Sequence, residues 1–196
     1  MTGVQEISKY FTLCRRLTLG MGVCPSWSLQ WKNFGTTISP WVVTFDALEP
    51  FATDLPERQV PILDYLKDPA SKPGFSTRLD VLVAPKGSSK ATKVLESDTK
   101  YLYWSLPQML AHHTVGGCPM NTGDLLGSGT ISGPEESALG SFLELSYDGK
   151  KEWEINGQKR TFLEDGDEVI FVGYAGEGVG FGECRGKVNA ADPIPN

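Results

Sequence analysis

The sequence predicts a mainly β protein with few helices, an α+β fold, and two observations carry this prediction. After Gly123 the chain consists of short apolar segments separated by tight-turn signals, which is typical of antiparallel strands joined by hairpins. In contrast, one segment alone, Tyr101 to Thr114, carries convincing helix signals. The 196 residues are 40% apolar and 21% charged, so the chain can bury the core of a globular domain.

Composition also excludes several classes of partner. The formal net charge of −6 argues against nucleic acid and anionic membranes, because both attract basic surfaces. No run of about eighteen apolar residues could span a bilayer. The four cysteines are far apart in the sequence and form no Cys-x-x-Cys pair, which argues against a zinc site or a disulfide framework. Reduced thiols and a cytoplasmic location are therefore expected.

The first half of the chain predicts a few short elements. KNFGTTISPWVVTF (residues 32–45) has the composition of a loop that enters a strand, and Asp46 is expected to cap a helical turn that follows it. Phe51 to Gly74 contains four prolines, which indicates an ordered surface excursion with little regular structure. Arg78 to Ala84 alternates as a strand, and Ala91 to Ser97 is expected to pair with it across a polar connection.

The helix and the C-terminal strands have clear boundary signals. Ser105 is a candidate N-cap with Pro107 in the first turn, and Gly116-Gly117 predicts the end of the helix. Two hairpin turns are expected at Asp148-Gly149 and Asn156-Gly157, because these pairs accept the positive φ of type I′ turns. The last two strands are expected at residues 168–174 and 179–188.

The chain is organised around GDLLGSGTISGPEESALGSFLE, residues 123–144. Thr130 and Ser132 add hydroxyl groups to a strand-like GSGTIS run, and these suit binding of a carbonyl or carboxylate oxygen. Glycine weakens a strand, so its frequency here suggests close approach of backbone or ligand. Three glycines punctuate the run: Gly127, Gly129 and Gly133.

Glu144 is the best single candidate for chemistry. In Phe142-Leu143-Glu144-Leu145 it places a carboxylate inside an apolar strand, where burial is costly unless the charge is paired. The alternative is a glycine-rich hairpin with Glu144 on its solvent face.

Other chemically capable residues favour structural roles. His112 and His113 are neighbours on the expected helix and point about 100° apart, so they are unsuited to share a metal; one is expected to face the core and one to face out. No Gly-x-Ser-x-Gly elbow is present, which argues against a serine triad. The acidic cluster of residues 164–168 lacks calcium-loop spacing and is expected to be a solvated turn.

Several of these segments carry a family resemblance. KNFGTT, GDLLGSGTISGPE, GSFLELS, FLEDGDEVIFVGYA and GFGECRGKV resemble the C-terminal part of the fumarylacetoacetate hydrolase family, from about Lys32 to the C-terminus. The resemblance implies a mixed β-roll or curled sandwich of that family's C-terminal domain type, here incomplete. It divides the chain into a divergent segment, 1–31, and residues 32–196 of a family-like catalytic domain.

The resemblance also implies an activity. The family hydrolyses a carbon–carbon bond of a 3,5-diketo acid, 4-fumarylacetoacetate, to fumarate and acetoacetate in tyrosine and phenylalanine catabolism, as a cytoplasmic homodimer with Mg²⁺ and Ca²⁺. By the same resemblance, Lys32 and Thr36 lie at the magnesium region, and Lys32 helps polarise the substrate carbonyl. Thr130 corresponds to a substrate-binding threonine, and Glu144 to the glutamate that orients the catalytic histidine.

A second reading of the chain stays open. In the family, the catalytic histidine and the acidic metal ligands lie upstream of the lysine motif, whereas Met1 to Trp31 contains no histidine, no aspartate and a single carboxylate, Glu6. The alternative expectation is a catalytically incomplete isoform or fragment. Such a chain would act as a scaffold or dimer partner, pairing with a full-length subunit.

Overall fold

The structure is a computed structural model and describes residues 37–190. Within this range the prediction of a mainly β fold is confirmed: the described chain consists mostly of antiparallel strands with few helices. The predictions made for segment 1–31, Lys32 and Thr36 lie outside the described residues. No helix in the described part of the chain is long and apolar enough to cross a membrane.

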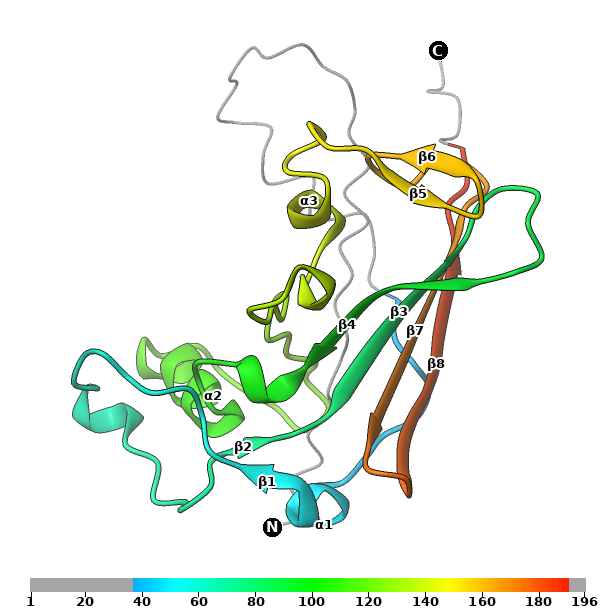
Figure 1. Ribbon diagram of the computed structural model, residues 1–196. Coiled ribbons are helices and arrows are strands. Elements are labelled where there is room, and N and C mark those ends of the chain that lie inside the picture. Colours follow the sequence, from blue (N-terminus) through cyan, green and yellow to red (C-terminus); the bar gives the residue numbers. More distant parts are fainter. Residues whose placement is uncertain (1–36, 191–196) are drawn as a thin grey trace, which may run out of the picture.

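The fold is built on a four-stranded antiparallel sheet with the order β4-β3-β7-β8 (Figure 1). All four strands were predicted from the sequence, and the predicted pairing of the first two is confirmed. Their bounds are β3 (Arg78–Ala84), β4 (Thr92–Asp98), β7 (Glu168–Ala175) and β8 (Val179–Lys187). Two-residue periodicity gives the sheet an apolar face and a charged face. The charged face carries Arg78 and Asp80 of β3 beside Glu96 of β4, and Arg78 bonds both carboxylates.

Two apolar clusters hold the sheet to the rest of the chain. The first lies where β7 turns into β8 and joins Ala175 and Phe181 to Val43 and Leu48. The second lies on the apolar face, where Val83 of β3 and Val169 of β7 meet side chains from two elements that lie between β4 and β7 in the sequence. Those elements are the short helix α3 (Phe142–Leu145) and the hairpin of β5 (Trp153–Ile155) and β6 (Gln158–Arg160).

The segment before the sheet corrects one prediction. No strand forms at residues 37–44; instead this segment runs beside the edge strand β8, where Ser39 Oγ donates to the carbonyl of Phe181 at 2.5 Å. Pro40 lacks the N–H that a strand ladder requires. The predicted helical turn is confirmed as α1 (Phe45–Leu48), but its N-cap is Thr44 and not Asp46.

The proline-rich excursion is confirmed as nearly free of regular structure. It holds short pieces alone: the 3₁₀ turns η2 (Glu49–Phe51) and η3 (Asp64–Leu66), and the two-residue strands β1 (Ala52–Thr53) and β2 (Gly74–Phe75).

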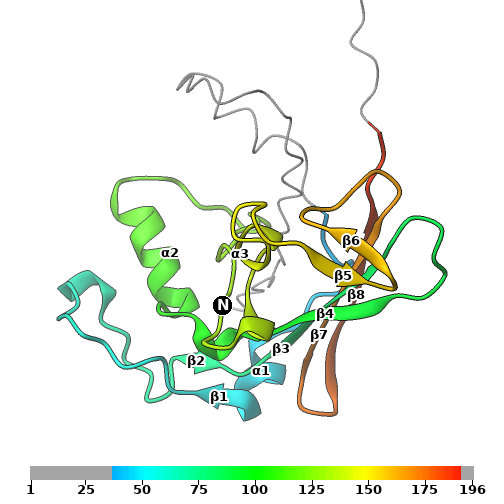
Figure 2. The same ribbon diagram turned by 45° about the horizontal axis from the view of Figure 1, so that its top comes forward.

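Helix α2 (Leu106–Val115) confirms the predicted helix with a later start. Ser105 is its N-cap, and Ser105 and Gln108 form a reciprocal capping box. Pro107 explains the start, because its ring would clash with the carbonyl of residue 103 if the helix continued upstream. Residues before the cap form the 3₁₀ turn η4 (Thr99–Tyr101). In both views, α2 and α3 lie on the β4 side of the sheet (Figures 1 and 2).

Residues 123–147 differ most from the sequence prediction. The GSGTIS run forms a loop and no strand, followed by the 3₁₀ turn η5 (Glu136–Ala138). Residues 142–145, predicted as a strand, form helix α3, because Ser141 caps the N–H of Glu144. The turn at Asp148-Gly149 exists, with φ of 58° and 77°, but it ends α3 and joins no two strands. The hairpin at Asn156-Gly157 is confirmed, since both residues have positive φ between β5 and β6.

Candidate functional site

The candidate site is centred on Glu144 in helix α3. Phe142 and Leu145 lie on one face of this helix and pack into the second apolar cluster, where the ring of Phe142 stacks on Trp153 at 5.1 Å. Residues three apart share a helix face, so Leu143 and Glu144 point away from the sheet. Glu144 is exposed and is not buried within a strand as first expected. The alternative placement, on a solvent face, is correct, although the element is a helix.

Three groups hold the Glu144 carboxylate. Ser132 Oγ donates to Oε1 at 2.8 Å and lies 3.0 Å from Oε2. The Gly140 N–H and the Ser141 hydroxyl each donate to Oε2 at 3.0 Å. Hydrogen bonds to a charged acceptor are stronger than neutral ones, so these contacts fix the side chain despite its exposure.

Close backbone approach brings these groups together. A Cβ at Gly140 would lie 2.9 Å from both Ile131 N and Ser132 Oγ, and one at Gly133 would lie 2.5 Å from the ring of Tyr101. Glycine therefore lets the loop before α3 fold back against the GSGTIS run. The expectation that glycines in this stretch mark close approach is confirmed at Gly133 and is wrong at Gly129, where a Cβ would meet nothing within 4 Å.

Thr130 lies on the same loop. It is exposed, and its hydroxyl has no hydrogen-bond partner among residues 37–190. The loop is anchored one residue later, where the Ile131 carbonyl accepts a hydrogen bond from Ser97 Oγ of β4 at 2.6 Å. Thr130 therefore precedes by two positions Ser132, the residue of this loop that contacts Glu144.

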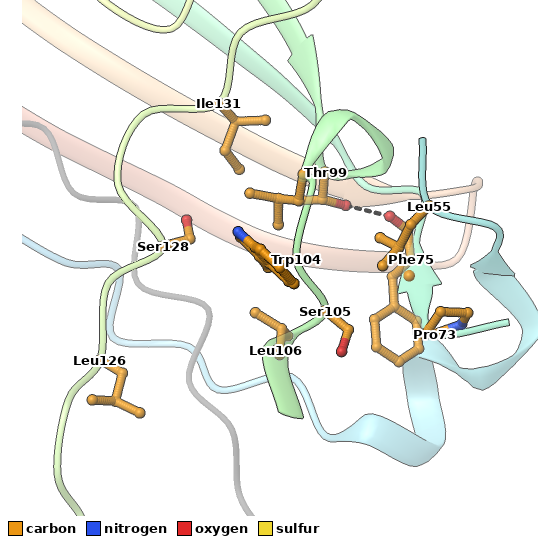
Figure 3. A pocket seen from close by; sticks show the side chains of 12 residues that line it. Leu55, Pro73, Phe75, Thr99, Trp104, Ser105, Leu106, Leu126, Ser128 and Ile131 are labelled. Atoms are coloured by element: carbon orange, nitrogen blue, oxygen red, sulfur yellow. Dashed lines mark hydrogen bonds between the residues drawn. The ribbon is translucent and has the colours of Figure 1, made fainter. Parts of the chain in front are cut away.

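A mostly apolar pocket lies beside this loop (Figure 3). Ser128 and Ile131 of the loop line it, together with Trp104 and Leu106 at the start of α2. A polar group of the pocket wall is hydrogen-bonded within the protein: the Thr99 hydroxyl donates to the Phe75 carbonyl at 2.6 Å. Thr130 belongs to the loop but not to the lining residues.

The metal region cannot be built from the described residues. Lys32 and Thr36 lie outside them, and residues 37–190 contain no group of three or more His, Cys, Asp or Glu side chains able to hold a metal ion. Oxygen-ligand ions such as Mg²⁺ and Ca²⁺ need several such groups at one point. The described residues therefore do not provide a ligand set for either ion.

Both histidines lie elsewhere, at the C-terminal end of α2. His112 Nδ1 is 3.0 Å from the hydroxyl of Tyr65, and His113 Nε2 is 3.2 Å from the thiol of Cys118. Both side chains are exposed, so the expectation that one faces the core is wrong. Neither contacts Glu144.

Sequence reasoning missed two contributors to the site, Gly140 and Ser141. A signal was present: Ser141-x-x-Glu144 is the capping-box pattern of a helix N-terminus, and it predicts a helix where a strand was expected. In the structure the Ser141 hydroxyl accepts from the Glu144 N–H at 3.2 Å while it donates to the Glu144 carboxylate.

The structure contradicts the environment that the sequence predicted for a second carboxylate, Asp167. Asp167, expected in a solvated turn, is fully buried and accepts hydrogen bonds from Arg160 and from the N–H groups of Lys86 and Glu164. Burial alone would raise the pKa of Asp167, but these hydrogen bonds outweigh it and lower the pKa below its ordinary value. Because its hydrogen-bonding capacity is occupied, Asp167 is a structural and not a reactive carboxylate.

Comparison with known proteins agrees with the sequence resemblance. The family model described as fumarylacetoacetate (FAA) hydrolase C-terminal matches residues 6–189. The chain is 48% identical over 165 residues to the fumarylacetoacetase of Arabidopsis thaliana, covering 83% of this chain and 39% of that protein. It is 50% identical over 163 residues to the Homo sapiens fumarylacetoacetase, covering 80% of this chain and 38% of the relative. The chain thus spans about two fifths of the length of the curated relatives it matches.

Proposed function

Because the chain belongs to the fumarylacetoacetate hydrolase family, we propose that it takes part in metal-dependent hydrolysis of a carbon–carbon bond in a 3,5-diketo acid. The proposed substrate is 4-fumarylacetoacetate, which yields fumarate and acetoacetate in tyrosine and phenylalanine catabolism. A cytoplasmic location and a homodimeric state are part of the same proposal.

The chemistry requires a base and a place for negative charge. Water adds to the carbonyl carbon of the fumaryl group, and a base removes the proton of the water. The carbon–carbon bond then breaks, its electron pair leaves on the acetoacetate side as an enolate, and a proton completes acetoacetate. A lysine near the developing charge stabilises it, the role that we assign to Lys32. Thr130 would hold the substrate through its hydroxyl group.

The observation that carries the proposal is the state of the Glu144 carboxylate. It is held in place by Ser132, Gly140 and Ser141, yet it remains exposed. A fixed, accessible carboxylate can orient an imidazole base and stabilise the imidazolium that forms when it takes a proton. We assign this orienting role to Glu144.

Mg²⁺ and Ca²⁺ enter from the resemblance alone. A divalent ion would stabilise the negative charge of the cleaved diketone. The described residues provide no ligand set for such an ion.

Two observations favour the second candidate function, a scaffold or dimer partner that pairs with a full-length subunit. Both histidines of the chain contact residues other than Glu144. The imidazole base that Glu144 would orient is therefore not among residues 37–190. Two large apolar side chains next to Glu144, Leu143 and Tyr147, are 54% and 59% exposed. An exposed apolar surface of this kind suits contact with another chain.

The experiment measures the loss of diketone absorbance with the purified chain, with and without Mg²⁺ and Ca²⁺. Turnover that depends on metal and is abolished by Glu144→Gln is expected for the enzyme. Co-purification with a tagged full-length subunit, without turnover by the chain itself, would support the scaffold function instead. Turnover that survives Glu144→Gln would contradict the role assigned to this carboxylate.

A further inference from the structure

We propose that Ser132 is a positioning residue for Glu144, and that it leaves Oε1 as the oxygen that accepts an N–H donor of the imidazole class. The inference rests on the function proposed for Glu144 and names a part of the site that the resemblance does not assign.

The two oxygens of the Glu144 carboxylate differ in their contacts. Oε2 lies 3.0 Å from each of three donor atoms, Ser132 Oγ, Gly140 N and Ser141 Oγ. Oε1 has a single donor among the described residues, Ser132 Oγ at 2.8 Å. A carboxylate oxygen offers about two lone-pair directions. With the single Ser132 proton directed to Oε1 at the shorter distance, the Gly140 N–H and the Ser141 hydroxyl occupy Oε2, whereas Oε1 retains one direction. Because Glu144 is exposed, a donor from outside the described residues can reach that direction.

Ser132 differs from the other two donors in where it comes from. Gly140 and Ser141 belong to the start of α3 and hold Oε2 as part of the local helix cap. Ser132 lies twelve residues upstream and is the contact shared by both oxygens. The local cap fixes the position of Oε2, and Ser132 then sets the rotation of the carboxylate about it.

The direction of the Ser132 hydroxyl is also determined. The Gly140 N–H lies 3.0 Å from both Ser132 Oγ and Glu144 Oε2 and is shared between them as a bifurcated hydrogen bond. Because an ionised carboxylate only accepts hydrogen bonds, the Ser132 hydroxyl proton is directed toward it. Serine suits this position because its hydroxyl donates and accepts at the same time.

An imidazole N–H fits the remaining lone pair of Oε1. Carboxylate acceptance of one ring N–H fixes which tautomer the ring adopts and favours its protonated form. A planar donor needs the acceptor at a defined angle, so loss of Ser132 would weaken this contact without removing the charge of Glu144. Ser132 acts through Glu144 and does not need to touch the substrate.

The test uses the full chain and free imidazole at about pH 6, where the ring is mostly protonated. Binding is followed through the NMR shift of the Gly140 amide, in the wild type and in Ser132→Ala. Ser137→Ala, at an exposed serine of the 3₁₀ turn η5, is the matched control, and Ser132→Thr retains the hydroxyl. Thermal unfolding of each variant shows that it is folded.

We expect imidazole affinity to fall about tenfold in Ser132→Ala, the order expected for loss of a charge-assisted hydrogen bond. It should be unchanged in Ser137→Ala and largely restored in Ser132→Thr. If the chain turns over substrate, kcat should fall by a similar factor in Ser132→Ala with KM unchanged.

Absence of imidazole binding to the wild type, or equal affinity in folded Ser132→Ala, would overturn the proposal. A raised KM in Ser132→Ala without a change in kcat would also contradict it, because that result would place Ser132 in substrate binding. Failure of the enzymatic function has a different signature: no turnover by the wild type while imidazole binding still depends on Ser132.

Discussion

Arg160 and Asp167 form a buried ion pair at the edge of the sheet. Arg160 Nε lies 2.9 Å from Asp167 Oδ2 and Nη2 lies 3.1 Å from Oδ1, with Asp167 fully buried and Arg160 7% exposed. Asp167 also accepts the backbone N–H groups of Lys86 and Glu164, both at 2.9 Å. One carboxylate thus joins β6, the end of β3 and the turn before β7.

Asp167→Asn should reduce the free energy of unfolding by about 3 kcal/mol at neutral pH, because it leaves a buried guanidinium without its counter-charge. Chemical denaturation measures this change. Asp54→Asn, an exposed aspartate, is the matched control and should change stability by less than about 0.5 kcal/mol. Equal stabilities of the two variants would contradict the structural role of Asp167.

The same pair makes stability depend on pH. The folded-state pKa of Asp167 is lowered, because hydrogen bonds from Arg160, Glu164 and Lys86 outweigh the opposing effect of burial. Its contribution is therefore complete above the unfolded-state pKa of about 3.9 and is lost as pH falls through the lower folded-state pKa. We expect the stability difference between wild type and Asp167→Asn to shrink below about pH 4. A difference that grows on acidification would contradict this.

Gly140→Ala should disturb the Glu144 site directly. Its Cβ would lie 2.9 Å from Ser132 Oγ and from the backbone of Ile131, so the hydroxyl that holds Glu144 must move. Gly186→Ala is the matched control, since a Cβ there meets nothing within 4 Å. We expect Gly140→Ala to cost about 1–3 kcal/mol of stability and to abolish the Gly140-to-Glu144 contact in a crystal structure. An unmoved Ser132 side chain would count against the close packing described here.

Gln108 connects helix α2 to the proline-rich excursion. Its Oε1 accepts from Ser105 N at 2.9 Å and from Arg58 Nη2 at 2.7 Å, and its Nε2 donates to the Leu66 carbonyl at 2.8 Å. Gln108→Ala should destabilise the fold by about 2–3 kcal/mol, because it leaves these buried groups unpaired. Thermal unfolding against Gln59→Ala, an exposed glutamine of the excursion, measures it. Similar midpoints for both variants would contradict this assignment.

The turn at Asn156-Gly157 gives a purely backbone prediction. Gly157 has φ of 78°, and a Cβ there would contact nothing within 4 Å. Gly157→Ala should therefore cost about 1 kcal/mol through conformational strain alone. Denaturation with Gly186→Ala as reference measures this cost, and a neutral effect would show that the turn has another conformation.

Where local signals agreed with the fold, the sequence predicted the structure well. The four strands of the main sheet follow from short apolar segments, one of them alternating, that are bounded by turn signals, and helix α2 follows from its Ser105 cap and Pro107. The hairpin at Asn156-Gly157 follows from its type I′ residues. Each of these elements is specified by residues adjacent in sequence.

Predictions failed where distant contacts decide the conformation. The GSGTIS run is a loop because Ser97 holds it at Ile131, a contact across 34 residues that periodicity cannot reveal. Asp167 looks like a solvated turn residue until Arg160 and the N–H of Lys86, 81 residues away, close around it. Glu144 was chosen as the candidate carboxylate from the sequence, but the hydroxyl and amide groups that hold it depend on the folding of two loop segments together. Its role in catalysis stays a prediction.

The most direct test of the central proposal is cleavage of fumarylacetoacetate by this chain in water enriched in ¹⁸O. Hydrolysis at the carbonyl of the fumaryl group places the water oxygen in a carboxylate of fumarate. In rapidly quenched samples, before ketone oxygens exchange with water, mass spectrometry should therefore find a single ¹⁸O in fumarate and none in acetoacetate. Glu144→Gln should abolish the labelled product. Product formation no faster than in buffer, or labelled fumarate formed equally by Glu144→Gln, would contradict the proposal that the Glu144 site carries this reaction.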